Sequence, residues 1–243
     1  MDTIIQNLKH VQQRIDEACK AAGRDSKEVK LLLATKTVSP ERIQQALAAG
    51  YTLIAENKVQ ELKEKYEALK STPHTNHFIG HLQTNKIKDI LKCEVSCVES
   101  LDRYDLAEKL HQKLSQAGRE MDVFIQVNTS GEESKFGVAP EQALELTRQV
   151  AQLPTLHIRG LMTIGLFSAE EDKVRKCFQL LKRIQKEIIA LNLPDVQPHE
   201  LSMGMSGDLE IAIAEGATIV RVGTAIFGQR IYPDSYYWNE QKA

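Results

Sequence analysis

Lys36 is the residue most suited to covalent chemistry. It follows a short apolar run, 31–35, and a helical pattern opens soon after it at Pro40. The charged form of an amine is disfavoured at the end of a buried strand, so we expect the pKa of this amine to be lowered. A neutral amine is a nucleophile that forms a Schiff base with a carbonyl compound. The alternative is a lysine whose stem packs while its head reaches water.

A glycine- and serine-rich segment, 202–208, is a second candidate. It contains Gly204, Ser206 and Gly207, and a helical pattern continues from Leu209. Glycines let backbone amides approach a ligand, and the start of a helix offers unpaired N–H groups to an anion. The segment therefore predicts a phosphate contact at Ser206, for which a helix cap is the alternative role.

Gly223 and Thr224 form a third candidate, directly after the apolar run 218–222. In (β/α)8 barrels, the loops after strands seven and eight commonly bind phosphate groups. In such a barrel these two residues and Ser206 would lie in those two loops. We therefore expect all three to contact one phosphate, with a helix cap as the alternative role of Thr224.

Arg221 lies inside that last apolar run. A buried guanidinium without a partner is strongly disfavoured, so this side chain must find one. It either bridges to a carboxylate or contacts a ligand, for instance a pyridine ring nitrogen, which an arginine would keep unprotonated. An unprotonated ring is a weaker electron sink, so carbanion chemistry at a bound amino acid would be suppressed.

Strand and helix patterns alternate along the chain and must position these residues. Short apolar segments predict eight strands: 31–36, 51–55, 76–80, 95–98, 122–127, 156–163, 199–203 and 218–222. Helical periodicity is clearest at 102–117, 140–152 and 169–191, and Pro140 suits a first helical position. This alternation indicates a parallel α/β sheet closed into a (β/α)8 TIM barrel. A doubly wound open sheet is the alternative, but no Gly-x-Gly-x-x-Gly follows the first strand.

No linker or shift in composition divides the chain, so we expect a single domain over 1–243. An extra N-terminal helix at 2–22 precedes the expected barrel at about 29–230, since Gly23 ends the first helical period. The aromatic tail, 231–243, is expected to pack back as a surface extension.

The composition, 42% hydrophobic and 26% charged, is that of an ordinary soluble globular protein. The net charge of -2 provides no basic field for nucleic acid or for an anionic membrane. No apolar run is long enough to span a bilayer, and the chain start lacks a signal-peptide pattern. The four scattered cysteines indicate reduced thiols. We therefore expect a cytoplasmic protein that binds neither nucleic acid nor membrane.

Three histidines, His77, His81 and His199, do not have the spacing of a zinc motif, so no metal site is expected. His77 stands at the start of a strand and is interpreted as a hydrogen-bonded core residue. A polar segment, 132–135, follows the fifth expected strand. It is either a lid over the site or a solvated turn, and the sequence leaves both alternatives open.

Several longer motifs are spread over nearly the whole chain. They include Ala34-Thr35-Lys36-Thr37-Val38-Ser39, Glu56-Asn57-Lys58-Val59-Gln60-Glu61, His77-Phe78-Ile79-Gly80-His81, Leu201-Ser202-Met203-Gly204-Met205-Ser206 and Arg221-Val222-Gly223-Thr224. Together they resemble the pyridoxal phosphate (PLP) homeostasis proteins of the YggS/PROSC group. Those proteins share the barrel of the alanine racemase N-terminal domain, fold type III of PLP proteins, without its C-terminal β-domain. Asn76 departs from the aromatic residue usual before His77, which concerns strand packing.

The resemblance implies that pyridoxal 5'-phosphate is the cofactor and that Lys36 holds it as an internal aldimine. It further implies phosphate contacts from Ser206, Gly223 and Thr224, with Arg221 near the ring nitrogen. The resemblance alone places Asn57 and Met203 close to the ring.

Two functions of different class follow from the resemblance. One is a PLP carrier that takes part in vitamin B6 homeostasis and in amino-acid and keto-acid balance, with no catalytic residues. The other is an amino-acid racemase of the alanine racemase type. We expect the carrier, because proton abstraction from both faces needs two positioned groups and only Lys36 is evident. A Schiff-base aldolase lacks an acid–base pair. We also expect a monomer that passes PLP to apo-enzymes.

Overall fold

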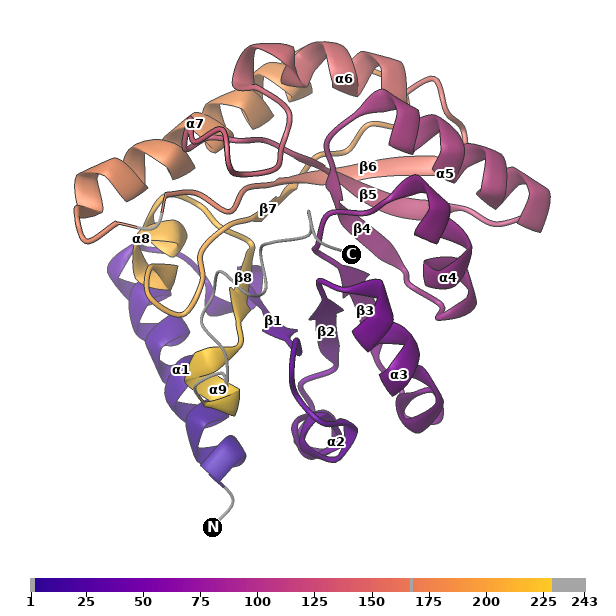
Figure 1. Ribbon diagram of the computed structural model, residues 1–243. Coiled ribbons are helices and arrows are strands. Elements are labelled where there is room, and N and C mark those ends of the chain that lie inside the picture. Colours follow the sequence, from indigo (N-terminus) through magenta and orange to yellow (C-terminus); the bar gives the residue numbers. More distant parts are fainter. Residues whose placement is uncertain (1–2, 167, 229–243) are drawn as a thin grey trace.

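A computed structural model describes residues 3–166 and 168–228 of the chain. Eight parallel strands pair in chain order, and β8 pairs with β1 to close the barrel (Figure 1). The strands are β1 (Lys30–Ala34), β2 (Leu53–Glu56), β3 (Thr75–Phe78), β4 (Cys97–Leu101), β5 (Met121–Gln126), β6 (Leu156–Met162), β7 (Glu200–Ser202) and β8 (Ile219–Val222). The expected (β/α)8 barrel is confirmed, and the open-sheet alternative is wrong.

Helices surround the strands on the outside of the barrel (Figure 1). The α-helices are α1 (Thr3–Ala21), α2 (Pro40–Ala48), α3 (Val59–Leu69), α4 (Ile87–Lys92), α5 (Tyr104–Ala117), α6 (Ala143–Val150), α7 (Glu171–Ala190), α8 (Leu209–Ala214) and α9 (Thr224–Phe227). Short 3₁₀ helices are η1 (Ser26–Glu28), η2 (Thr84–Lys86) and η3 (Pro140–Gln142). None of the helices in the described ranges is long and apolar enough to cross a membrane.

The extra N-terminal helix, α1, packs where the barrel closes. Its apolar residues Leu8, Val11 and Ile15 recur at helical spacing and are fully buried. The helix contacts α8 and α9, and the Asn7 side chain donates a hydrogen bond to the Ile226 carbonyl at 2.9 Å. Because α8 and α9 follow strands seven and eight, α1 supports the two loops that are expected to bind phosphate.

The core has two parts. A small apolar cluster contributed by several strands includes Leu32, Ala55, Phe124, Met162 and Ile219. A larger apolar cluster lies between the strands and the surrounding helices. All four cysteines are buried free thiols.

Two strand boundaries differ from the sequence prediction in ways that concern the site. The first strand ends at Ala34, so Lys36 lies in a turn and not in the strand. The fourth strand is Cys97–Leu101, later than the predicted 95–98. It continues through Glu99 and Ser100, two polar residues that are buried here. The N-terminal helix matches its prediction within a residue. The tail at 231–243 lies outside the described residues, and the domain limits stay a prediction.

Candidate functional site

All the candidate residues lie at one mouth of the barrel. Because the strands are parallel, their carboxyl ends and the loops that follow them share one rim. Seven residues lie on or directly after the ends of four strands: Lys36 after β1, Asn57 after β2, Met203 and Ser206 after β7, and Arg221, Gly223 and Thr224 on or after β8.

Lys36 stands in a tight turn and is partly buried. The Val38 N–H donates to the Thr35 carbonyl at 3.0 Å, which closes the turn around Lys36. Thr37 adopts the left-handed region with φ 62°, where a β-branched residue is uncommon. Lys36 was expected at the carboxyl end of a buried strand; the structure instead places it in a strained turn two residues beyond the end of β1.

The loops after β7 and β8 meet at their hydroxyl groups. Thr224 Oγ1 donates to Ser206 Oγ at 3.3 Å, and Arg14 of α1 donates to the Ser206 carbonyl at 3.0 Å. Asp208 and Gly223, rather than Ser206 and Thr224, occupy the cap positions of α8 and α9. The alternative in which Ser206 and Thr224 serve as helix caps is therefore wrong.

The glycines of these loops are required mainly by chain packing. Gly204 has φ +92°, and a Cβ there would come within 2.5 Å of the Ala212 Cβ. A Cβ at Gly223 would come within 2.9 Å of the Ala34 carbonyl oxygen, on the neighbouring strand β1. A Cβ at Gly207 would meet no atom within 4 Å, so of these three glycines only Gly207 has open space beside it.

Arg221 is buried, and its guanidinium is held from two sides. Nη1 donates to Ser202 Oγ at 2.8 Å, and Nη2 donates to the Thr163 carbonyl at 2.7 Å. Burial lowers the pKa of Arg221, while the charges of Glu99 and Asp208 act in the opposite direction. The guanidinium thus reaches the carboxylate of Glu99 only through the Ser202 hydroxyl. The predicted direct bridge to a carboxylate is absent from these contacts, and the predicted ligand contact stays a prediction.

Glu99 is the carboxylate at the other end of this chain of hydrogen bonds, and it is fully buried. It accepts from Ser202 Oγ at 2.5 Å and lies 2.6 Å from His77 Nδ1. Burial alone would raise the pKa of Glu99, but the hydrogen bond and charge of His77, with Arg221 and Ser202, lower it overall. The interpretation of His77 as a hydrogen-bonded core residue is confirmed. Sequence reasoning missed Glu99, because the predicted fourth strand ended before it.

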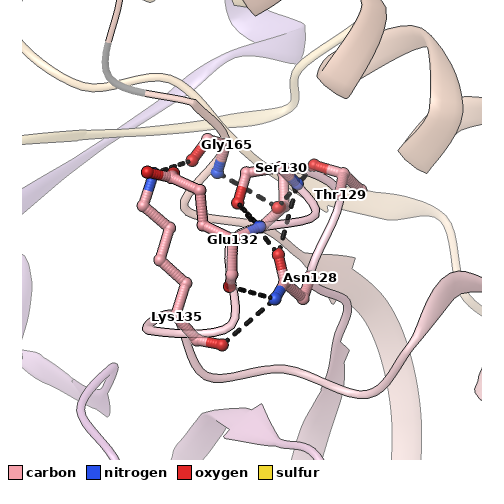
Figure 2. A network of polar contacts seen from close by, with 7 residues as sticks. Asn128, Thr129, Ser130, Glu132, Lys135 and Gly165 are labelled. Atoms are coloured by element: carbon pink, nitrogen blue, oxygen red, sulfur yellow. Dashed lines mark hydrogen bonds and ion pairs between the residues drawn. The ribbon is translucent and has the colours of Figure 1, made fainter.

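The loop after β5 is anchored to the same mouth. The Asn128 side-chain amide donates to the carbonyls of Glu132 and Lys135 at 2.9 Å and 3.1 Å, and the Lys135 amine donates to the Gly165 carbonyl at 2.8 Å (Figure 2). Further along, the Phe136 ring stacks on His81 with centroids 4.1 Å apart. The loop therefore has a defined conformation in which Glu132 stays exposed. Its role as a lid stays a hypothesis.

His81 is itself a candidate that the sequence left unassigned. Burial, and then the charge of Arg103, lower the pKa of its imidazole, which favours the neutral ring. Its Nδ1 atom lies 4.0 Å from Asp102 Oδ2, too far for a hydrogen bond.

A cavity of about 500 Å³ opens at the opposite mouth, where the strands begin. Its charged groups already pair with one another: Arg159 with Asp122, and Lys30 with Glu200. None of the seven candidate residues lines it. The seven candidate residues are therefore separate from this cavity, although His77, which contacts Glu99, lines it.

The chain is similar in sequence to known proteins over nearly its whole length. Residues 2–231 match the family model for the N-terminal domain of alanine racemase. A pyridoxal phosphate homeostasis protein of Aquifex aeolicus is 44% identical over 232 residues, which cover 93% of this chain and 98% of that protein. A pyridoxal phosphate homeostasis protein of Pseudomonas aeruginosa is 43% identical, with 96% and 98% covered.

A solved structure is also similar. PipY of Synechococcus elongatus, solved with PLP bound, has a TM-score of 0.77 at 31% identity, covering 88% of this chain and 100% of that one. The similarity in sequence and in fold extends over nearly the whole chain in each case. This chain belongs to the alanine racemase N-terminal domain family and, within it, to the pyridoxal phosphate homeostasis proteins.

Proposed function

We propose that this chain binds pyridoxal 5'-phosphate covalently at Lys36 and acts as a PLP carrier in vitamin B6 homeostasis. One observation carries the proposal. A lysine turn, a buried arginine and two hydroxyl-bearing loops that touch each other lie on one rim of the barrel. An aldehyde with a pyridine nitrogen and a phosphate needs those three kinds of group.

Two unpartnered buried atoms test whether the residues present fit this cofactor. Among the residues described, Asn57 Oδ1 and His81 Nδ1 are buried and have no hydrogen-bond partner. Such atoms carry a free-energy cost unless another group satisfies them. Both residues follow the ends of neighbouring strands, β2 and β3. The polar ring of PLP carries groups that can form hydrogen bonds with such atoms. Asn57 and His81 therefore fit this cofactor.

Each candidate residue then has a role that its chemistry allows. The Lys36 amine would join to the cofactor aldehyde carbon with loss of one water. Ser206 and Thr224 would hold the phosphate with their hydroxyls, and Gly223 with its backbone N–H. Arg221, fixed by Ser202, would keep the ring nitrogen unprotonated. Asn57 and Met203 would contact the ring.

When bound, PLP supplies an electrophilic carbon and an electron sink. The buried Arg221 opposes the second of these properties, because a guanidinium next to the ring nitrogen disfavours its protonation. This favours holding the cofactor over turnover. The relatives from Aquifex aeolicus and Pseudomonas aeruginosa, both named pyridoxal phosphate homeostasis proteins, support the same reading. We infer that apo-enzymes receive the cofactor and that the carrier is a cytoplasmic monomer.

Titration of the purified protein with PLP tests the proposal. We expect the absorption band of a protein Schiff base in the wild type and its loss in Lys36→Ala at unchanged circular dichroism. A Lys36→Ala variant that keeps the band would contradict the assignment. Incubation with L- or D-alanine tests the alternative function. Sustained interconversion at enzymatic rates would establish a racemase and overturn the carrier.

A further inference from the structure

A second lysine, Lys65 of α3, lies behind the Lys36 turn and is itself buried, with 7% of its surface exposed. Its amine donates to three acceptors: the Thr35 carbonyl at 2.9 Å, Glu56 Oε1 at 2.7 Å and Glu61 Oε2 at 2.9 Å. An ammonium group has three N–H donors, so every one is used. Glu56, Glu61 and Lys65 are called the Lys65 cluster.

The Lys65 cluster forms hydrogen bonds with the residues on both sides of Lys36. Before it, Thr35 offers its carbonyl to Lys65 and donates its hydroxyl to Glu56 Oε1 at 2.6 Å. After it, the Thr37 N–H donates to Glu61 Oε2 at 2.5 Å. The residue before Lys36 and the residue after it are therefore fixed by the same three side chains.

The backbone conformation of Thr37 indicates that these hydrogen bonds are needed to hold the turn. Its left-handed backbone, φ 62°, persists only where the surroundings hold it. The Thr37 N–H bond to Glu61 is such a constraint, and the turn bond from Val38 to Thr35 is another. Without the carboxylate, the turn would relax toward the ordinary regions and Lys36 would leave the backbone in another direction.

Stability alone is a weak reason for this cluster. Burial raises the pKa of Glu56, and the neighbouring Lys65 charge offsets only part of that effect. Apolar side chains of similar volume often replace buried ion pairs without loss of stability. The cluster instead forms hydrogen bonds to the backbone of Thr35 and of Thr37. These two residues flank Lys36, the proposed PLP lysine.

We propose that the Lys65 cluster is a positioning device that sets the direction of the Lys36 side chain toward the carbonyl carbon of PLP. The inference rests on the proposed function, because it presumes attachment at Lys36. Lys65 does not react; it acts through the turn. The Lys65 amine lies near the site, but it donates three hydrogen bonds. These bonds prevent it from reacting with the cofactor aldehyde.

Lys65→Met tests the proposal, with Lys63→Met as the control on the exposed face of the same helix. The first readout uses the protein without cofactor: amide exchange at Thr37 should be about tenfold faster in Lys65→Met, because a constraint on that turn is lost. The second is the rate of PLP attachment to Lys36, which should fall about tenfold, since small misplacement of a reacting group is costly. Lys63→Met should match the wild type in both.

Glu61→Ala, with Glu64→Ala as its control, decides the matter if Lys65→Met does not fold. Glu61 is on the surface side of the cluster, and its loss removes the acceptor of the Thr37 N–H while Lys65 and Glu56 remain paired. Slower attachment together with faster Thr37 exchange supports positioning. A folded variant with wild-type values in both assays overturns it. A wild type that attaches no PLP refutes the proposed function instead, whatever Thr37 does.

Discussion

The guanidinium of Arg221 and the hydroxyl of Ser202 lie 2.8 Å apart inside the barrel. The Ser202 hydroxyl donates a hydrogen bond to Glu99, and the other carboxylate oxygen of Glu99 contacts His77 Nδ1. The positive charge of Arg221 is thereby balanced by the carboxylate of Glu99, which it reaches only through the Ser202 hydroxyl. This arrangement holds the guanidinium in place and leaves it charged.

Removing the Ser202 hydroxyl should break this series of hydrogen bonds. In Ser202→Ala both Arg221 Nη1 and Glu99 lose a partner, so the free energy of unfolding should fall by about 1–3 kcal/mol. Urea denaturation measures the loss. Ser100→Ala is the matched control, because the buried Ser100 hydroxyl has no hydrogen-bond partner within the described part of the chain. Equal losses in the two variants would contradict a special role of Ser202.

The lowered pKa of Glu99 predicts how stability depends on pH. A carboxyl whose folded pKa is below its ordinary value of 4.5 contributes stability above pH 4.5, and this contribution is lost as the pH falls through the folded value. Wild-type protein should therefore lose stability more steeply below pH 4.5 than Glu99→Gln does. Thermal unfolding between pH 3 and 7 compares the slopes, with the exposed Glu187→Gln as control. Parallel curves for wild type and Glu99→Gln would show that folding does not lower the pKa of Glu99.

Two glycines of the loop after β7 should respond differently to alanine. Gly204→Ala adds a Cβ at φ +92° and within 2.5 Å of Ala212, and should cost about 1–3 kcal/mol of stability. Gly207→Ala meets no atom within 4 Å and should stay within about 1 kcal/mol of the wild type. Denaturation midpoints check both values. Similar midpoints would mean that Gly204 is not constrained by packing.

The sequence predicts the barrel well, because the apolar runs that become strands also bury their side chains on both faces. The Lys36 region and both glycine loops follow from their places after strands. Glu99 and Lys65 do not, since a carboxylate within a strand and a lysine on a helix look solvated until the partners that bury them are known. Asn57 and Met203 came from the family resemblance alone. The hydrogen bonds of Ser202 and of the Thr35 and Thr37 backbone join residues far apart in the chain, and no local pattern reports them.

The most direct measurement is borohydride reduction of the PLP-bound protein followed by mass mapping of the modified peptide. We predict a single reduced pyridoxyl group on Lys36, and none on Lys65, whose amine is held by Thr35, Glu56 and Glu61. A reduced group on any other lysine, with Lys36 unmodified, would contradict the account.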